Sequence, residues 1–152
     1  MEKTEKTRIK ICGLTRMEDA IAAAECGADF LGFIFVRESP RCVEPCTVRE
    51  IIKQLPVEAI PVGVFLNCPT ADIAEIMEYC GLRIAQLHGD ESANVAKSLG
   101  TGRVWKVFHL CGEDDVRRAS VFPAAAVVAD TRSGRQRGGT GLTGNCSLAE
   151  QV

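Results

Sequence analysis

Two short apolar runs, about 120 residues apart, each end on a side chain that can take up or release a proton. The first run ends at Cys12, and the second, residues 124–129, is followed directly by Asp130. Turn-forming residues come next in both places, as they do where a strand ends. In a parallel α/β barrel, the carboxyl ends of the strands share one rim, at which catalysis takes place. A thiol and a carboxyl at such a rim would serve as a general base and a general acid.

The surroundings of Cys12 and Asp130 leave two interpretations open for each residue. Lys10 lies two positions before Cys12, so the two side chains share a strand face and the Lys10 ammonium could favour a thiolate. Alternatively, Cys12 is only a small buried apolar residue, as free cysteines often are. Burial beside apolar neighbours would favour the protonated form of Asp130, which can donate a proton. The alternative for Asp130 is a turn or helix-capping aspartate.

Three further segments carry groups suited to binding an anion or lining a pocket. Arg41 follows Ser39-Pro40 in a polar loop and could clamp a carboxylate or phosphate, unless it is simply exposed. Gln86 and His88 share a face at the end of a predicted strand and could reach a pocket, although a single histidine often only satisfies a local hydrogen bond. Residues 132–141, rich in glycine and arginine, could hold an anion on backbone N–H groups or act as a mobile lid; the alternative is a flexible turn.

Strands that alternate with helices along the chain would position these residues. Apolar runs predict strands over residues 8–12, 28–35, 60–66, 84–87, 104–110 and 124–129. Helical patterns predict helices over residues 17–25, 70–80, 91–99 and 113–121. Two further helices are predicted, one capped by Thr47 and one beginning near Ser147. The alternation predicts a parallel sheet with right-handed crossovers, either closed as a barrel or open and doubly wound. No long linker or change in composition interrupts it, so residues 1–152 are predicted to be a single domain.

Composition and charge narrow the class of protein. Of the 152 residues, 46% are hydrophobic and 25% are charged, which is typical of a soluble globular protein. The net charge of −2 predicts no general affinity for nucleic acid or for an acidic membrane. The apolar runs are too short to span a bilayer, and residues 1–8 are too charged for a secretory signal, so a cytoplasmic location is expected.

The cysteines and glycines carry predictions about metals and cofactors. Eight cysteines are many for this length, but nothing in the sequence indicates secretion, so free thiols are expected. Cys42 and Cys46 form one loose pair and only two histidines are present, so no metal site is expected. The first predicted strand lacks a G-x-G-x-x-G turn, so a dinucleotide cofactor is not expected either.

Together these motifs closely resemble the phosphoribosylanthranilate isomerase family of tryptophan biosynthesis. The matching segments, in the family's order and at about its spacing, are residues 10–15, 39–41, 86–89, 130–131 and 138–141. The resemblance runs from about Arg8 to Ala149 and implies a (β/α)8 barrel of the TIM-barrel type, incomplete here with about six βα units. Residues 144–146 depart from the family's Phe-Asp-Trp run. Strands seven and eight, whose loops usually hold phosphate in such barrels, are not predicted within the 152 residues.

The resemblance implies a cofactor-free isomerase that converts N-(5-phosphoribosyl)anthranilate to 1-(2-carboxyphenylamino)-1-deoxyribulose 5-phosphate by an Amadori rearrangement. It implies that Asp130 protonates the ring oxygen and that Cys12, as thiolate, removes the proton from the sugar C2. Arg41 would bind the anionic substrate, and Gln86 and His88 would line its pocket. Two alternatives stay open: an inactive, truncated barrel fragment, or another sugar-phosphate enzyme of the TIM-barrel type. The partner expected is the small phosphorylated substrate, and the sequence predicts no oligomeric state.

Overall fold

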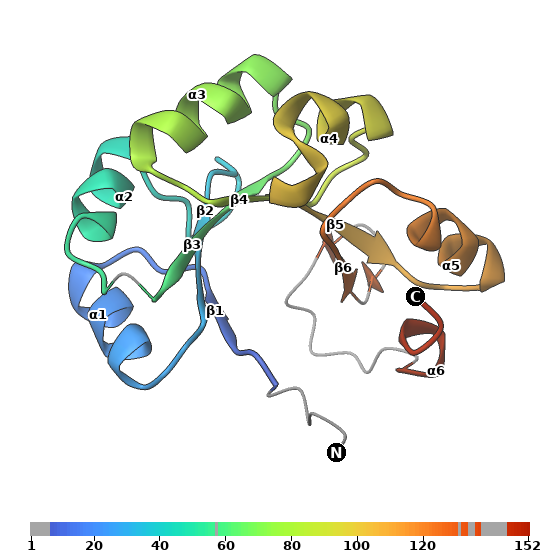
Figure 1. Cartoon of the computed structure of the whole chain (residues 1–152), viewed down its shortest axis with the longest axis horizontal. Helices are drawn as coiled ribbons and strands as arrows, with labels where there is room; N and C mark the ends of the chain where they lie inside the picture. Colours follow the sequence, from blue (N-terminus) through green and yellow to red (C-terminus); the bar gives the residue numbers. More distant parts are fainter. Residues whose placement is uncertain (1–6, 57, 131, 134–135, 138–145) are drawn as a thin grey trace. The chain divides into compact units, whose positions relative to one another are not determined.

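The computed structural model describes residues 7–56, 58–130, 132–133, 136–137 and 146–152. From residue 10 to residue 130, strands and helices alternate along the chain (Figure 1). The chain forms two compact units, Met1–Ala85 and Gln86–Val152. The prediction that residues 1–152 are a single domain stays a prediction.

Three parallel strands and three helices make up the unit Met1–Ala85. The strands are β1 (Lys10–Cys12), β2 (Phe30–Ile34) and β3 (Ile60–Phe65). The helices that follow them are α1 (Met17–Glu25), α2 (Pro45–Ile52) and α3 (Thr70–Cys80). β2 pairs in parallel with both β1 and β3. Figure 1 shows α1, α2 and α3 on one side of these strands, and α2 packs against α3.

The core of this unit lies between β2, β3 and their helices. Every residue of β2 is buried, and all but the first residue of β3 are buried. A strand covered on both faces needs such a continuous apolar run, which is why these two segments were recognisable in the sequence. The largest fully buried side chains here are those of Leu31, Phe33, Val48, Ile51, Val62, Phe65 and Ile73.

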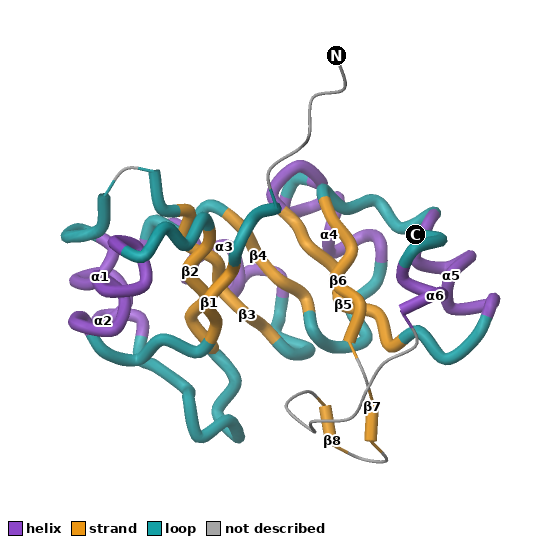
Figure 2. The backbone as a smooth tube through the Cα atoms, turned by 90° about the horizontal axis from the view of Figure 1, so that it is seen from below, coloured by secondary structure: helices purple, strands orange, loops and turns teal. Residues whose placement is uncertain are grey.

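The unit Gln86–Val152 contains the remaining elements. They are the end of β4 (Ile84–Leu87), α4 (Ala93–Leu99), a 3-10 turn (Thr101–Arg103), β5 (Val104–His109), α5 (Glu113–Ser120), β6 (Ala126–Asp130), β7 (Arg132–Ser133), β8 (Gln136–Arg137) and α6 (Cys146–Ala149). β5 and β6 run parallel and side by side (Figure 2), and their register pairs His109 with Asp130. β7 and β8 form a separate antiparallel pair.

Strand order decides between the two predicted closures. Backbone hydrogen bonds order the strands β1-β2-β3-β4-β5-β6, the same order as in the chain. A doubly wound sheet reverses its strand order at a switch point, whereas a βα barrel adds each strand beside the one before it. The chain therefore has the TIM-barrel type of fold, with six strands in the main sheet of the described residues, and the predicted fold class is confirmed.

Two predicted helix starts were wrong. α2 begins at Pro45, so Thr47 lies inside the helix instead of capping it. Proline at the first helical position fixes φ in the helical range and needs no hydrogen-bond acceptor for its nitrogen, which explains the earlier start. α4 begins at Ala93 instead of residue 91, because the Glu91 carboxylate accepts a hydrogen bond from the Gly89 N–H in the preceding turn.

Three sequence predictions concern thiols, the glycine loop and membrane helices. The seven cysteines whose side chains are described are free thiols, as predicted. The Gly138–Gly141 motif and residues 144–145 lie outside the described residues. Within the part of the chain that the structure describes, no helix is long and apolar enough to cross a membrane.

Candidate active site

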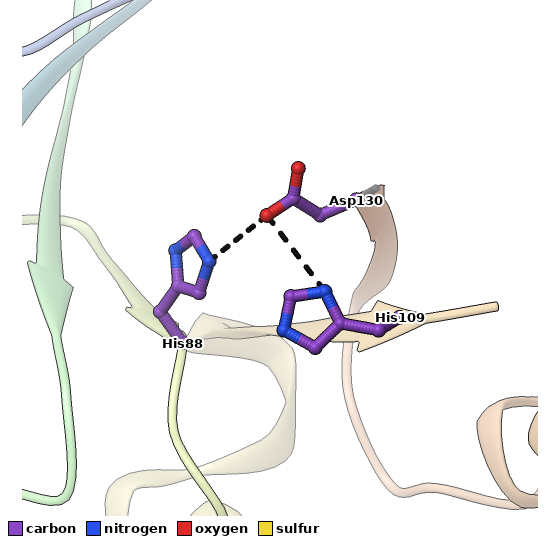
Figure 3. A group of neighbouring side chains, drawn as sticks. All are labelled: His88, His109 and Asp130. Carbon is purple, nitrogen blue, oxygen red and sulfur yellow. Dashed lines mark hydrogen bonds and ion pairs between the residues drawn. The ribbon is translucent and has the colours of Figure 1, made fainter. Parts of the chain in front are cut away.

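Three strand ends in the unit Gln86–Val152 bring two imidazoles and a carboxyl together (Figure 3). His88 follows β4, His109 ends β5 and Asp130 ends β6. Nε2 of His88 lies 3.2 Å from Oδ2 of Asp130, which is hydrogen-bond distance. Nδ1 of His109 lies 3.9 Å from the same oxygen. The parallel register places His109 directly opposite Asp130, so these two side chains extend from neighbouring positions of the sheet.

The electrostatics of this cluster favour a neutral His88. Burial lowers the pKa of His88, and the nearby His109 and Lys106 lower it further, while the Asp130 carboxylate opposes them. A neutral imidazole can either donate a proton to a carboxylate or accept one from a carboxylic acid. The His88–Asp130 hydrogen bond can therefore hold one shared proton. Two imidazoles face the Asp130 carboxyl group, which the sequence analysis did not anticipate.

A buried lysine holds the turn that carries His88. Nζ of Lys106 donates hydrogen bonds to the carbonyl oxygens of Leu87 and Gly89, at 3.2 and 2.6 Å. It also lies 3.3 Å from the Glu91 carboxylate, which accepts a hydrogen bond from the Gly89 N–H. Lys106 and Glu91 are both buried. The residues on both sides of His88 are therefore fixed by one charged pair.

Three of these residues were missed by the sequence analysis. His109 and Lys106, in a predicted strand, and Glu91, at the start of a predicted helix, were not singled out. A lysine inside the apolar run of β5 was the available signal, because a buried ammonium needs a partner. Gln86, which was predicted to line the pocket, is buried in β4 two residues before His88.

In the unit Met1–Ala85, Cys12 and Lys10 lie over Gly32. Cys12 is the register partner of Gly32 on the neighbouring strand. A Cβ atom added to Gly32 would lie 2.8 Å from Sγ of Cys12 and 3.1 Å from Nζ of Lys10. Both side chains therefore occupy the same face, as predicted, and the two atoms are at most 5.9 Å apart, the sum of those distances.

Gly32→Ala is expected to disturb this arrangement. Its methyl group would overlap Cys12 Sγ, and such overpacking typically costs about 1–3 kcal/mol of the free energy of unfolding. Gly102→Ala is the matched control, because a Cβ atom there meets nothing within 4 Å. Urea unfolding of the two variants measures the difference. Equal stabilities would show that the close contact over Gly32 carries no constraint.

Arg41 reaches the end of the same strand from the loop after β2. Nη1 of Arg41 donates a hydrogen bond of 3.0 Å to the Cys12 carbonyl oxygen. The guanidinium also covers Gly13, where an added Cβ atom would lie 2.5 Å from Nη1. Gly13 has φ +86°, a conformation that other residues rarely adopt. The bond uses one of the five guanidinium N–H donors, and the fork geometry of Arg41 suits a carboxylate or phosphate.

The structure thus brings the predicted residues together in two groups. Cys12 and Arg41 adjoin each other in the unit Met1–Ala85. His88 and Asp130 are hydrogen-bonded in the unit Gln86–Val152. Each group carries a side chain that can transfer a proton, and each lies at strand ends, where proteins of this fold carry out catalysis.

The strand order, together with Cys12 and Asp130 at strand ends, defines a TIM-barrel-type protein with acid–base groups at the carboxyl ends of its strands. The chain belongs to the N-(5'-phosphoribosyl)anthranilate isomerase family, whose model, described as N-(5'phosphoribosyl)anthranilate (PRA) isomerase, matches residues 9–151. The resemblance seen in the sequence is therefore confirmed. Members of this family are isomerases of tryptophan biosynthesis.

Two curated relatives, both N-(5'-phosphoribosyl)anthranilate isomerases, illustrate the similarity. The protein of Chlorobaculum parvum is 42% identical over 151 residues, which cover 96% of this chain and 68% of the relative. That of Syntrophus aciditrophicus is 39% identical over 146 residues, which cover 96% of this chain and 64% of the relative. The chain thus spans about two thirds of the length of these relatives.

Solved structures agree with the sequence comparison. The phosphoribosyl anthranilate isomerase of Thermus thermophilus superposes with a TM-score of 0.85 at 35% identity, covering 95% of this chain and 70% of the other. The enzyme of Thermotoga maritima gives a TM-score of 0.85 at 34% identity, covering 94% and 70%. A third structure, with a TM-score of 0.78 at 34% identity over 84% of this chain and 66% of the other, holds reduced 1-(o-carboxyphenylamino)-1-deoxyribulose 5-phosphate.

Proposed function

We propose that this chain catalyses the Amadori rearrangement of N-(5-phosphoribosyl)anthranilate to 1-(2-carboxyphenylamino)-1-deoxyribulose 5-phosphate. Family membership supports the reaction, and the complex of a related isomerase with a reduced deoxyribulose phosphate supports a small phosphorylated substrate. The hydrogen bond between Asp130 and His88 carries the proposal, because it provides a carboxyl group that can hold a proton beside a neutral imidazole.

Asp130 acts first in this proposal, as the general acid. It transfers its proton to the furanose ring oxygen while the bond between that oxygen and C1 breaks and the substrate nitrogen forms an iminium with C1. The developing alkoxide needs a proton at this moment, so a positioned acid accelerates the step. His88 then faces a carboxylate and donates its Nε2–H to it, which stabilises the product form of the acid.

Cys12 acts second, as the general base. The iminium acidifies the C2–H bond, so a thiolate is basic enough to remove this proton and leave an enolamine, which tautomerises to the ketone. In this proposal Cys12 acts as its thiolate, and the Lys10 ammonium lies at most 5.9 Å from Cys12 Sγ. The proton given by Asp130 and the proton taken by Cys12 balance, as an isomerisation requires.

Arg41 holds the anionic substrate beside Cys12. Its guanidinium is fixed by the Cys12 carbonyl oxygen and can use further N–H groups on a carboxylate or phosphate. Gln86 and His88 line the pocket in this proposal. The reaction needs no cofactor, and its partner is the small substrate alone, with no role for nucleic acid or a membrane. The proposal places the protein in the cytoplasm.

Cys12→Ser tests the proposed base. We expect kcat to fall by about 10²–10⁴-fold, because a serine hydroxyl of nearly the same size is a far weaker proton acceptor than a thiolate. Loss of anthranilate-substrate fluorescence measures the rate. Cys26→Ser is the matched control, since Cys26 is exposed at the end of α1 and is expected to keep the wild-type rate.

The same assay separates the alternative functions. Equal rates for wild type, Cys12→Ser and Cys26→Ser would remove Cys12 from the mechanism. No turnover by the wild type, with no complementation of a tryptophan auxotroph, would favour an inactive barrel fragment. Turnover of a related aminoaldose phosphate but not of the anthranilate substrate would favour another sugar-phosphate isomerase.

A further inference from the structure

We propose that His88, His109 and Asp130 bind a divalent transition metal ion such as Zn²⁺. Each residue offers one ligand atom, and these atoms all lie within 4.8 Å of one another. Nδ1 of His109 is buried and has no hydrogen-bond partner among the described residues. A buried polar atom without a partner costs free energy, and a bound cation would satisfy it. Figure 3 shows both imidazoles turned toward the same carboxylate oxygen.

The ligand spacing suits a tetrahedral ion. Zinc binds imidazole nitrogen and carboxylate oxygen at about 2.0–2.2 Å, so tetrahedral ligand atoms lie about 3.3 Å apart. The distance from His88 Nε2 to Asp130 Oδ2 is 3.2 Å, which meets this value. The distance from His109 Nδ1 to the same oxygen is 3.9 Å and would need to close by about half an ångström. The two imidazole nitrogens lie within 4.8 Å of each other, so they too would need to approach on binding.

Three ligands leave one coordination position open. The side chains of His88, His109 and Asp130 are 21%, 19% and 24% exposed, so water can reach the cluster and take that position. Two neutral imidazoles and one carboxylate are a donor set that zinc and its neighbours in the first transition row prefer. The strand register fixes two of the ligands and the Lys106 network fixes the turn of the third.

The buried lysine beside His88 does not prevent cation binding. Lys106 is the buried cation beside His88, and it lies 3.3 Å from the Glu91 carboxylate. The pair is neutral as a whole, so its repulsion of a metal ion is small. The sequence analysis expected no metal because the cysteine spacing does not fit one. It could not show that the only two histidines of the chain, 88 and 109, meet at one carboxylate.

A bound ion would inhibit the proposed reaction. It would occupy Oδ2 of Asp130, the atom that carries the proton in the proposed mechanism, and a carboxylate bound to a metal cannot be protonated there. This consequence rests on the proposed function, whereas the binding itself does not. Binding and inhibition are therefore measured separately.

Calorimetry with Zn²⁺ and absorption spectroscopy with Co²⁺ test the site on the whole chain in metal-free buffer. We expect one ion per chain in the wild type, and a cobalt spectrum of nitrogen and oxygen ligands without the charge-transfer band of a thiolate. Removing a residue that only hydrogen-bonds to a metal ligand typically lowers metal affinity by about 10–100-fold. His109→Phe removes a ligand nitrogen itself, so we expect it to lower zinc affinity by about 100-fold or more. Cys111→Ser is the matched control, because Cys111 is an exposed thiol two residues after His109.

Each result decides the proposal. Wild-type binding that Cys111→Ser keeps and His109→Phe loses, with the expected cobalt spectrum, supports it. No binding, or a thiolate spectrum that His109→Phe leaves unchanged, overturns it. The cobalt spectrum of the wild type identifies the ligand type without any variant. If the chain binds zinc but shows no isomerase activity, the proposed function fails while the metal site stands.

Discussion

Replacing Asp130 with asparagine is expected to lower kcat on N-(5-phosphoribosyl)anthranilate by about 10²–10⁴-fold, the usual contribution of a positioned acid. Asparagine keeps the shape of the side chain and can still hydrogen-bond to Nε2 of His88. It has no acidic proton to give to the ring oxygen, so the ring must open without general acid catalysis. Fluorescence loss of the substrate, followed at saturating concentration, measures kcat.

A surface aspartate provides the matched control for this variant. Asp114 lies in the first turn of α5, where its exposed side chain pairs with Arg117, and Asp114→Asn is expected to keep the wild-type rate. Urea unfolding of both variants separates loss of catalysis from loss of fold. If Asp130→Asn turns over like the wild type, Asp130 is not the acid and the proposed mechanism is wrong.

The element pattern of this chain could be predicted well because the signals are local. β4 (Ile84–Leu87) and α1 (Met17–Glu25) have the predicted bounds, since an apolar run or a helical stripe bounded by glycine is visible in the sequence itself. The start of α4 was wrong because Glu91 accepts a hydrogen bond from the preceding turn, and the start of α2 was wrong for a different reason. Thr47 is a good capping residue by type, but Pro45 already begins the helix.

The candidate site could be predicted only in part, because contacts between strands depend on register. Cys12 and Asp130 were identifiable as strand-end residues that can move a proton. The hydrogen bond from Arg41 to the Cys12 carbonyl oxygen could not be predicted. The two residues are 29 positions apart, and only the path of the loop after β2 brings them together. His109 was missed because only the pairing of β5 with β6 brings it to Asp130.

Two ion pairs of the same chemical type differ in one respect, burial, and this difference predicts their effects on stability. Lys106 and Glu91 have side chains that are 5% and 3% exposed, whereas those of Lys53 and Glu50 are 54% and 63% exposed. Exposed pairs contribute about 0–1 kcal/mol, because water competes and both side chains lose freedom. Buried pairs behave differently, since neither charge can return to water when its partner is removed.

Lys106→Met is therefore expected to lower the free energy of unfolding by about 3–5 kcal/mol. The substitution leaves the Glu91 carboxylate buried without its cation and removes the donor for the carbonyl oxygens of Leu87 and Gly89. Lys53→Met, the control at the exposed pair, should change the free energy of unfolding by less than about 1 kcal/mol. Urea unfolding measures both variants, and similar losses would show that burial does not decide the effect.

A double variant identifies the cause of the loss at Lys106. Glu91→Gln removes the buried negative charge and keeps an oxygen that can accept the Gly89 N–H. Lys106→Met combined with Glu91→Gln should therefore be more stable than Lys106→Met alone, by about 1 kcal/mol or more. If the second substitution adds its own loss instead, the unpaired charge is not the cause. The missing donor to the turn on both sides of His88 would then account for the effect, and the pair would act by fixing that turn.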